Sequence, residues 1–303
     1  MAMRVATFSI SDQMIAAALR TQSTMANMQI QEASGVVSSD FGGYGSSSQQ
    51  IVNLQVSVTR ADSYIDAATQ ADSKIQVMYS AVGSIADLLT NFRSLLTSAT
   101  SAASTDSSSV AQSAQEALQQ MASLLNTQYS GDYVFGGART DVAPVDIDSA
   151  TYPTATSPST ANTSYYQGDQ EKASVRVSDS QTISYGVTAD NSAFEQAMRA
   201  INLVANNSPL STATLNEALD LSESAIDGVG VLQSKISNAA SAIERASSFQ
   251  TEYQTYAQTL GSDLTSVDVA AVTASLATYQ AQLTASYAAI SKVQGLNLAS
   301  YLT

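Results

Sequence analysis

The sequence of 303 residues contains no cysteine, no histidine and no tryptophan. Without cysteine the chain cannot form a disulfide framework, a thiolate metal site or a thiol redox motif. The lack of histidine also excludes the His-Glu-x-x-His motif of metallopeptidases. No nucleophile motif is present, and the scattered Asp and Glu residues single out no carboxylate pair. We therefore predict that the protein is not an enzyme and has no catalytic residues, no cofactor and no metal site.

Charged residues are also scarce, at 13% of the chain, where about a quarter is usual. With 12 Lys and Arg against 26 Asp and Glu, the net charge is −14 and the pI is about 4.1. This acidity argues against nucleic acid as a partner, because its phosphate backbone is bound through Lys and Arg. Ser, Thr, Ala and Gln fill the polar positions instead, so the expected surfaces carry little charge and pack easily against one another.

Neither a secretory leader nor a membrane span is visible in the sequence. The N-terminal stretch MAMRVATFSISDQM lacks the apolar core of a signal peptide. No run of about 18 apolar residues occurs in the chain, so we expect no transmembrane helix and no stable membrane insertion. Composition alone would place such a protein in the cytoplasm by default.

The C-terminal stretch from Val267 to Leu302 has the pattern of a helix that the chain itself has little material to cover. Its apolar residues recur three or four apart, which places them on one side of a helix. They are Val269, Val272, Leu276, Tyr279, Leu283, Tyr287, Ile290 and Val293, and the opposite side carries Ala274, Ala277, Ala281, Ala285 and Ala288. After Asp268 the only charge is Lys292. A helix that is apolar or small all round is normally buried, so other helices must cover this one.

The N-terminal stretch, residues 5–33, has the same character. From Val5 to Gln31 its only charges are Asp12 and Arg20. Its apolar residues form two faces, one with Phe8, Ile15, Leu19, Ala26 and Ile30 and the other with Met14, Ala18 and Met25. A Gly/Ser-rich segment, residues 34–48, follows and is interpreted as a hinge, because it lacks the Lys and the preceding strand of a phosphate-binding loop.

Two long helical seams lie between these ends. In the first, apolar residues alternate three and four apart from Ile51 to Leu96, which is a sustained heptad pattern with Asp72 as its one polar member. A Ser/Thr-rich turn at 97–109 ends it, and a returning helix carries apolar residues to Leu125. The second seam runs from Leu215 to Leu260 and includes Tyr253.

The period between the seams changes to that of strands. YSGDYVFGG contains a Ser-Gly-Asp turn followed by a strand with Tyr133 and Phe135 on one face. Two further alternating runs, 175–177 and 183–187, predict a hairpin. The Ser/Thr/Pro/Ala-rich loop at 149–164 is expected to face outward and to tolerate deletion. Helix resumes at Ser192, where Ser192 and Glu195 match a capping box.

These elements predict a mainly α fold with a small β insert. Pairing of the N- and C-terminal halves would give an elongated rod of long antiparallel, coiled-coil-like helices. We divide the chain into a terminal helical assembly domain (1–45 and 262–303), a long helical rod domain (46–130 and 190–261) and a small outward-facing β-rich insert (131–189).

Three stretches resemble the bacterial flagellin family. LLNTQYSGDYVFGGARTDVAPVD, 124–146, is similar to a segment of the hook-filament junction proteins, the hook-associated protein 3 group, in which a Gly-containing turn leads to an aromatic strand. Residues 165–198 are similar to the strand region and following helix of that group, and 266–302 to the C-terminal pattern of the family. The hinge at Ser34–Phe41 departs from the family because it has neither the usual basic residue nor the proline, so no contacts of that loop are carried over.

The resemblance implies a flagellin-like fold and an extracellular structural subunit of the bacterial flagellum, exported by the flagellar type III apparatus without a cleaved signal peptide. It implies a homo-oligomer in a helical ring, with a hook-side junction protein, filament flagellin and an export chaperone as partners. It also implies terminal segments that become helical only on assembly. The sequence offers a physical reason, because isolated helices are marginal without a packing partner.

We predict that the assembly interface consists of apolar residues of the two terminal stretches, namely Phe8, Ile15, Leu19, Met25, Leu276, Tyr279, Leu283, Tyr287, Ile290 and Val293. Two alternatives remain open. A filament flagellin would share the terminal helices and the seams, although the aromatic strand and the Ala-Ser-Tyr motif at 285–287 favour the junction group. The second alternative is a type III secreted, membrane-interacting translocator. The scarcity of Lys and Arg on the polar helix faces argues against it.

Overall fold

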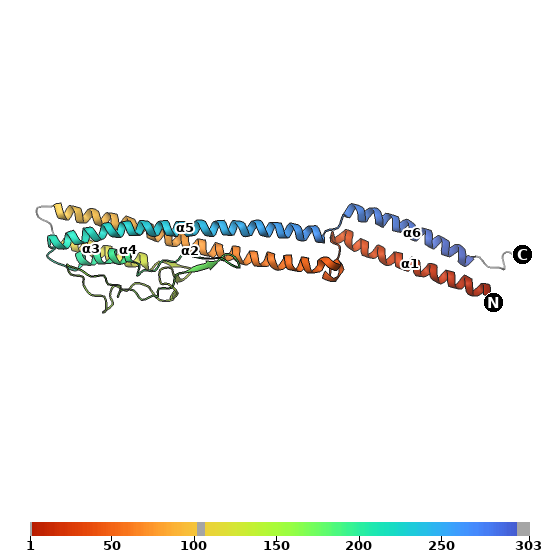
Figure 1. Ribbon diagram of the computed structural model, residues 1–303, viewed down its shortest axis with the longest axis horizontal. Coiled ribbons are helices and arrows are strands. Elements are labelled where there is room, and N and C mark those ends of the chain that lie inside the picture. The colour runs from red at the N-terminus through yellow and green to blue at the C-terminus, as the bar shows by residue number, and fades with distance from the viewer. Residues whose placement is uncertain (1, 102–106, 296–303) are drawn as a thin grey trace. The chain divides into compact units, whose positions relative to one another are not determined.

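The computed structural model describes residues 2–101 and 107–295, and the side chains of 12–101 and 107–293. The chain consists of long helices (Figure 1) and two small two-stranded hairpins, so the predicted mainly α class with a small β insert is confirmed. The described elements are α1 (Ala2–Ser34), η1 (Phe41–Ser47), α2 (Ser48–Ser101), α3 (Ser107–Leu125), β1 (Gln128–Tyr129), β2 (Asp132–Tyr133), β3 (Ser174–Arg176), β4 (Thr182–Ser184), α4 (Ser192–Ala205), α5 (Thr212–Thr265) and α6 (Val269–Gly295). None of the helices in these described ranges is both long and apolar enough to cross a bilayer.

The chain forms two compact units. The terminal unit consists of Met1–Thr59 and Gln254–Thr303, and the central unit of Arg60–Tyr253. α2 and α5 contribute residues to both units, and both hairpins belong to the central unit. The division into three domains drawn from the sequence remains a prediction.

The interior of the central unit is built on the two predicted seams. Seven successive seam residues of α2 are buried, namely Ile75, Met78, Val82, Ile85, Leu89, Phe92 and Leu96. They belong to one apolar core with residues of α3, α4 and α5. An ion pair joins Arg93 of α2 to Glu223 of α5 at 3.7 Å, between side chains that are both about half exposed. Asp72, the polar seam residue, is half-buried and accepts a 2.6 Å hydrogen bond from Gln76.

The strands confirm one hairpin and correct another. β3 and β4 pair antiparallel with Val175 opposite Ile183, as the alternating pattern predicted. The strand expected from Tyr133 to Phe135 is shorter, because β1 and β2 pair over only two residues each around the tight turn at Ser130 and Gly131. Beyond it Val134 and Phe135 are both buried, so the residues after the turn do not alternate between two faces.

Helix α4 is the most completely covered helix of the central unit, with eleven of its fourteen residues buried. It begins at Ser192 as predicted, but the cap differs. Asn191 is the N-cap residue, and its side chain accepts a 3.1 Å hydrogen bond from the amide of Ala193. Glu195 does not complete a capping box, because its carboxylate is engaged by Asn162 and Arg199 instead.

Candidate functional site: the terminal helix pair

α1 and α6 pack side by side within the terminal unit, and they run in opposite directions (Figure 1). α1 ends at Gly35, whose φ of 70° suits glycine and whose amide bonds to the carbonyl of Gln31 at 2.8 Å. α6 begins after Asp268, whose carboxylate accepts a 3.1 Å hydrogen bond from the amide of Ala271. The sequence therefore places a helix stop and a helix start at the same end of the pair.

A short piece of antiparallel backbone joins these two helix ends, and we call residues 35–37 with 265–267 the β-clasp. Val36 faces Ser266 across an isolated bridge. The amide of Val37 donates to the carbonyl of Thr265 at 2.9 Å, and the amide of Val267 donates to the carbonyl of Gly35 at 3.0 Å. The side-chain amide of Gln31 adds a 2.8 Å bond to the carbonyl of Val37.

The register of the pair brings the predicted residues of both ends to common levels. One turn from the β-clasp, Thr273 donates a 2.9 Å hydrogen bond to Glu32. Since both helices rise about 1.5 Å per residue, Tyr279 lies near the level of Met25, and Ile290 near the level of Ile15. The structure thus brings residues from opposite ends of the sequence into one helix pair.

The predicted interface residues fall into three groups by exposure. Leu276 is buried, at 9% exposure, while Met25, Tyr279, Leu283, Ile290 and Val293 are half-buried. Ile15, Leu19 and Tyr287 are exposed, Leu19 at 60% and Tyr287 at 52%. The side chain of Phe8 lies outside the described residues. Leu276 therefore serves the contact within the pair, and the exposed group is what the pair presents outward.

Further residues belong to each side of this division. Ala18 and Val272 are buried with Leu276, whereas Ile30 and Val269 are exposed apolar residues. The row of small residues on α6, 274, 277, 281, 285 and 288, is exposed throughout. The helical period identified these residues as apolar or small, but only the placement of α1 against α6 shows which side is left open.

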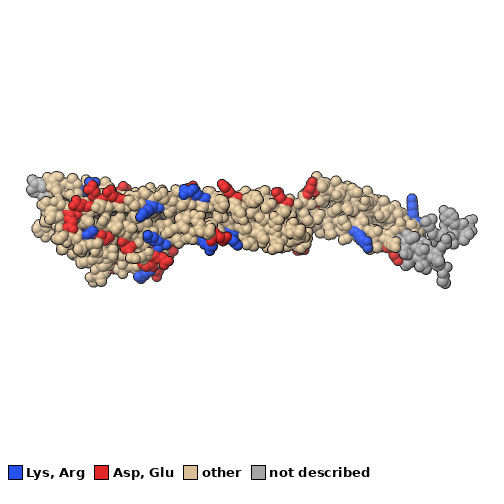
Figure 2. All heavy atoms as spheres, viewed as in Figure 1, with Lys and Arg blue, Asp and Glu red and all other residues tan. Residues whose placement is uncertain are grey.

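The terminal unit carries little charge. It contains three of the 12 basic residues and five of the 26 acidic residues, for a net charge of −2, which leaves −12 on the central unit. Figure 2 shows few coloured side chains over α1 and α6 and many more over the central unit. Copies can therefore bring their terminal units together with little repulsion, while the acidic central unit favours solubility.

The central unit contains a cavity of about 230 Å³ lined by residues of α4 and of the loop before it. We call residues 153–164 of that loop the strap. Glu195 and Arg199 form an ion pair beside the cavity. Arg199 Nη2 donates a 3.3 Å hydrogen bond to Glu195 Oε2, while Arg199 Nε lies 3.0 Å from Glu195 Oε1 without hydrogen-bond geometry. Glu195 is 6% exposed, so the pair replaces much of the water that a lone carboxylate would need.

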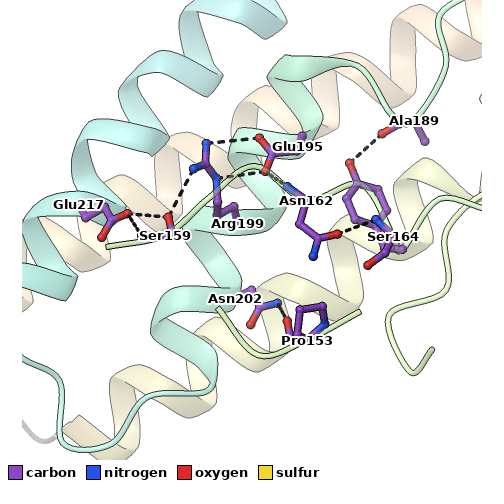
Figure 3. A network of polar contacts seen from close by, with 10 residues as sticks. Pro153, Ser159, Asn162, Ser164, Ala189, Glu195, Arg199, Asn202 and Glu217 are labelled. Carbon is purple, nitrogen blue, oxygen red and sulfur yellow. Dashed lines mark hydrogen bonds and ion pairs between the residues drawn. The ribbon is translucent and has the colours of Figure 1, made fainter. Parts of the chain in front are cut away.

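The polar residues around this cavity bind the backbone of the strap (Figure 3). Glu195 accepts a 3.0 Å hydrogen bond from the amide of Asn162, and Glu217 accepts one of 2.7 Å from the amide of Ser159. Asn202, which is buried, donates to the carbonyl of Pro153 and accepts from the amide of Ala155, both at 3.2 Å. These contacts argue against the expectation that the 149–164 loop tolerates deletion, because buried polar groups of α4 and α5 bond to the loop backbone.

Two titratable groups near the strap, Glu217 and Tyr165, also form hydrogen bonds and have shifted pKa values. Burial would raise the pKa of Glu217, but hydrogen bonds from the Ser157 and Ser159 hydroxyls and the Ser159 amide outweigh it and lower that pKa. Burial raises the pKa of Tyr165, whose hydroxyl donates to the carbonyl of Ala189 at 3.0 Å. These interactions hold the loop in place, and we assign this region a structural role. Within the described ranges, no group of three or more acidic residues is placed to hold a metal ion.

The chain is similar to known proteins both in part of its sequence and in its fold. Residues 5–140 match the model of the bacterial flagellin N-terminal helical region. A solved structure from Vibrio parahaemolyticus, described as a flagellar hook-associated protein, superposes with a TM-score of 0.60 at 16% identity, over 72% of this chain and 97% of that chain. Bacillus cereus FlgL superposes with a TM-score of 0.50 at 14% identity, over 65% of this chain and 98% of that one.

A search of curated proteins finds no match. The structural likenesses, at these identities, establish the fold. The family match is independent of them and runs from α1 through β2. Residues 5–140 are therefore similar to the flagellin N-terminal helical region, which confirms the resemblance to the flagellin family seen in the sequence.

Proposed function

We propose that this protein is a structural subunit of the bacterial flagellum that forms the junction between hook and filament through helix–helix contacts of its terminal unit. The observation that carries the proposal is the outward face of the α1–α6 pair. Leu19, Ile30 and Tyr287 are more than half exposed there, on helices almost without charge. A surface of this kind is typical of a protein–protein contact.

Contacts between copies of the chain would be energetically favourable. Burial of a Leu, Ile or Phe side chain is worth about 1.5–3 kcal/mol. Several such residues per subunit, together with the exposed row of small residues on α6, would let neighbouring helices approach closely. Contacts between different faces of identical subunits generate rings or helices, which agrees with a helical ring of subunits.

Two observations support the junction rather than the filament. The motif at 124–146 resembles that of the junction group, and the Vibrio parahaemolyticus protein with the same fold is described as hook-associated. From this assignment follow an extracellular location in the flagellum, export by the type III apparatus, and a hook-side junction protein, filament flagellin and an export chaperone as partners.

Electron microscopy of isolated hook ends incubated with the purified full chain tests the proposal. We expect a short added zone at the hook end and no growth beyond it. Growth of the purified protein into long filaments seeded by fragments would show a filament flagellin instead. Flotation with liposomes examines the translocator alternative, and strong binding of the monomer would contradict the junction role.

A further inference from the structure

The α1–α6 pair contains few contacts that fix how far one helix is shifted along the other. Among its described side chains only Ala18, Val272 and Leu276 are buried. In the same part of the chain, the hydrogen bond from Thr273 to Glu32 is the one side-chain bond that joins the two helices. The rest of the contact is made by half-buried residues, which recur every three or four positions.

A repeating contact of this kind tolerates slippage. A shift of α6 by one helical turn, about 5.4 Å, replaces one half-buried residue of α6 by the next one along the same side, such as Tyr279 by Leu283. The outward face would change more, because Leu19 and Ile30 come from α1 whereas Val269 and Tyr287 come from α6. The face is composite, so its shape depends on the register of the pair.

The β-clasp is the part of the terminal unit that distinguishes one register from the next. Its two backbone bonds, from Val37 to Thr265 and from Val267 to Gly35, have fixed partners. They lie directly at the end of α1 and before the start of α6, and Thr273–Glu32 continues the same register one turn further. Backbone pairing does not repeat with the helical period, so a slipped pair would lose both bonds.

We propose that the β-clasp is a positioning element that sets the register of α1 against α6 and thereby assembles the composite outward face. This inference rests on the proposed function, because it concerns the same surface. The residues of the β-clasp need not touch a neighbouring subunit; they act through the two helices that they align.

Replacement of Val37 and Val267 by proline tests this proposal, because proline removes both amide donors. In the full chain we expect V37P/V267P to lower the fraction of hook ends carrying added protein by about tenfold or more, given the loss of two backbone bonds. The control S39P places proline at an exposed position of the same connecting segment, outside the β-clasp, and is expected to add to hooks like the original chain.

A disulfide provides the rescue. Val36 and Ser266 form the non-hydrogen-bonded pair of the bridge, the geometry in which Cα atoms lie about 4.5 Å apart and a disulfide can close. The chain has no cysteine, so V36C/S266C forms one defined bond. Oxidation of V36C/S266C in the V37P/V267P background is expected to restore addition to hook ends, and reduction to abolish it again. Unimpaired addition by V37P/V267P, or impaired addition that oxidation fails to restore, would overturn the proposal.

Hydrogen exchange separates this inference from the proposed function. The amides of Val37 and Val267 are expected to be protected in the original chain. If they exchange at the rate of an unstructured peptide, both free and on hook ends, the β-clasp does not form and the proposal fails. If they are protected but the original chain does not add to hook ends, the proposed function fails and the β-clasp stands.

Discussion

The side-chain amide of Gln250 donates a 3.0 Å hydrogen bond to the carbonyl oxygen of Val177, from a buried position on α5. Val177 directly follows β3, so this bond fastens the β3–β4 hairpin to the seam of α5. The sequence pattern placed Tyr253 in that seam, but its side chain is 41% exposed. A polar residue takes the interior position because a strand carbonyl there needs a donor.

Replacement of Gln250 by leucine is expected to destabilise the central unit by about 1–3 kcal/mol, because the Val177 carbonyl would be left buried without its partner. Chemical denaturation followed by circular dichroism measures this free energy. Gln258 of α5 is exposed, and Q258L is the matched control, with an expected change within about 0.5 kcal/mol. Equal midpoints for the two variants would contradict the role of this bond.

The long helices could be predicted from the sequence because their signal is repeated many times. The seam of α2 is correct from Ile75 to Leu96, where each apolar residue supports the same period. The burial of isolated polar residues could not be predicted from the sequence. Gln250, for example, is buried where it binds the carbonyl of Val177, which lies 73 residues away in the sequence. The predicted capping box of α4 was wrong for a related reason. Glu195 fits the local sequence motif, but its carboxylate binds Arg199 and the strap instead.

Asn202 is expected to be as important for the strap as Gln250 is for the hairpin. N202L would leave the carbonyl of Pro153 and the amide of Ala155 without their partners. We expect a loss of about 1–3 kcal/mol in the free energy of unfolding. Asn238 is an exposed residue of α5, and N238L provides the control. Proteolysis would find the strap cleaved faster in N202L, and an unchanged cleavage rate would show that Asn202 does not hold it.

The contact between α2 and the turn after β3 should make the free energy of unfolding depend on pH in the acidic range. Hydrogen bonds from the Tyr64 hydroxyl and the Arg60 guanidinium, at 2.8 and 2.9 Å, lower the pKa of Asp179. A carboxylate whose folded-state pKa is depressed contributes stability above its unfolded pKa of about 3.9 and loses it as pH falls through the folded value. The stability difference between the original chain and D179N is therefore expected to be present at neutral pH and to vanish in strong acid.

Denaturation midpoints of both proteins at several pH values measure this difference. D227N removes the same charge from an exposed position of α5 and serves as the control. The control should show no comparable loss as the pH falls below the unfolded pKa. A D179N difference that stays constant down to strong acid would mean that ionised Asp179 adds nothing to the contact.

The side of the terminal helix pair that stays exposed could be predicted only in part. Periodicity indicates which residues of a helix share a side, but not which side its partner covers. Leu276 and Tyr287 belong to one predicted stripe, yet Leu276 is buried and Tyr287 is half exposed. Two helices cannot cover all of a broad stripe, so part of it stays available to other chains.

This division gives the sharpest test of the interface. L19D and Y287D place charges on the exposed side, so we expect a normally folded chain whose addition to hook ends falls at least tenfold, since a charge without a partner in a buried contact costs several kcal/mol. L276D is expected to disrupt the pair itself and to lower the helical circular dichroism or raise hydrogen exchange in α1 and α6. L283D and I290D change half-buried residues, so we expect each to weaken the pair and also to reduce addition to hook ends. N27D adds the same charge at an exposed polar site of α1 and is the control. Normal addition by L19D/Y287D would show that the outward side of the pair is not the assembly surface.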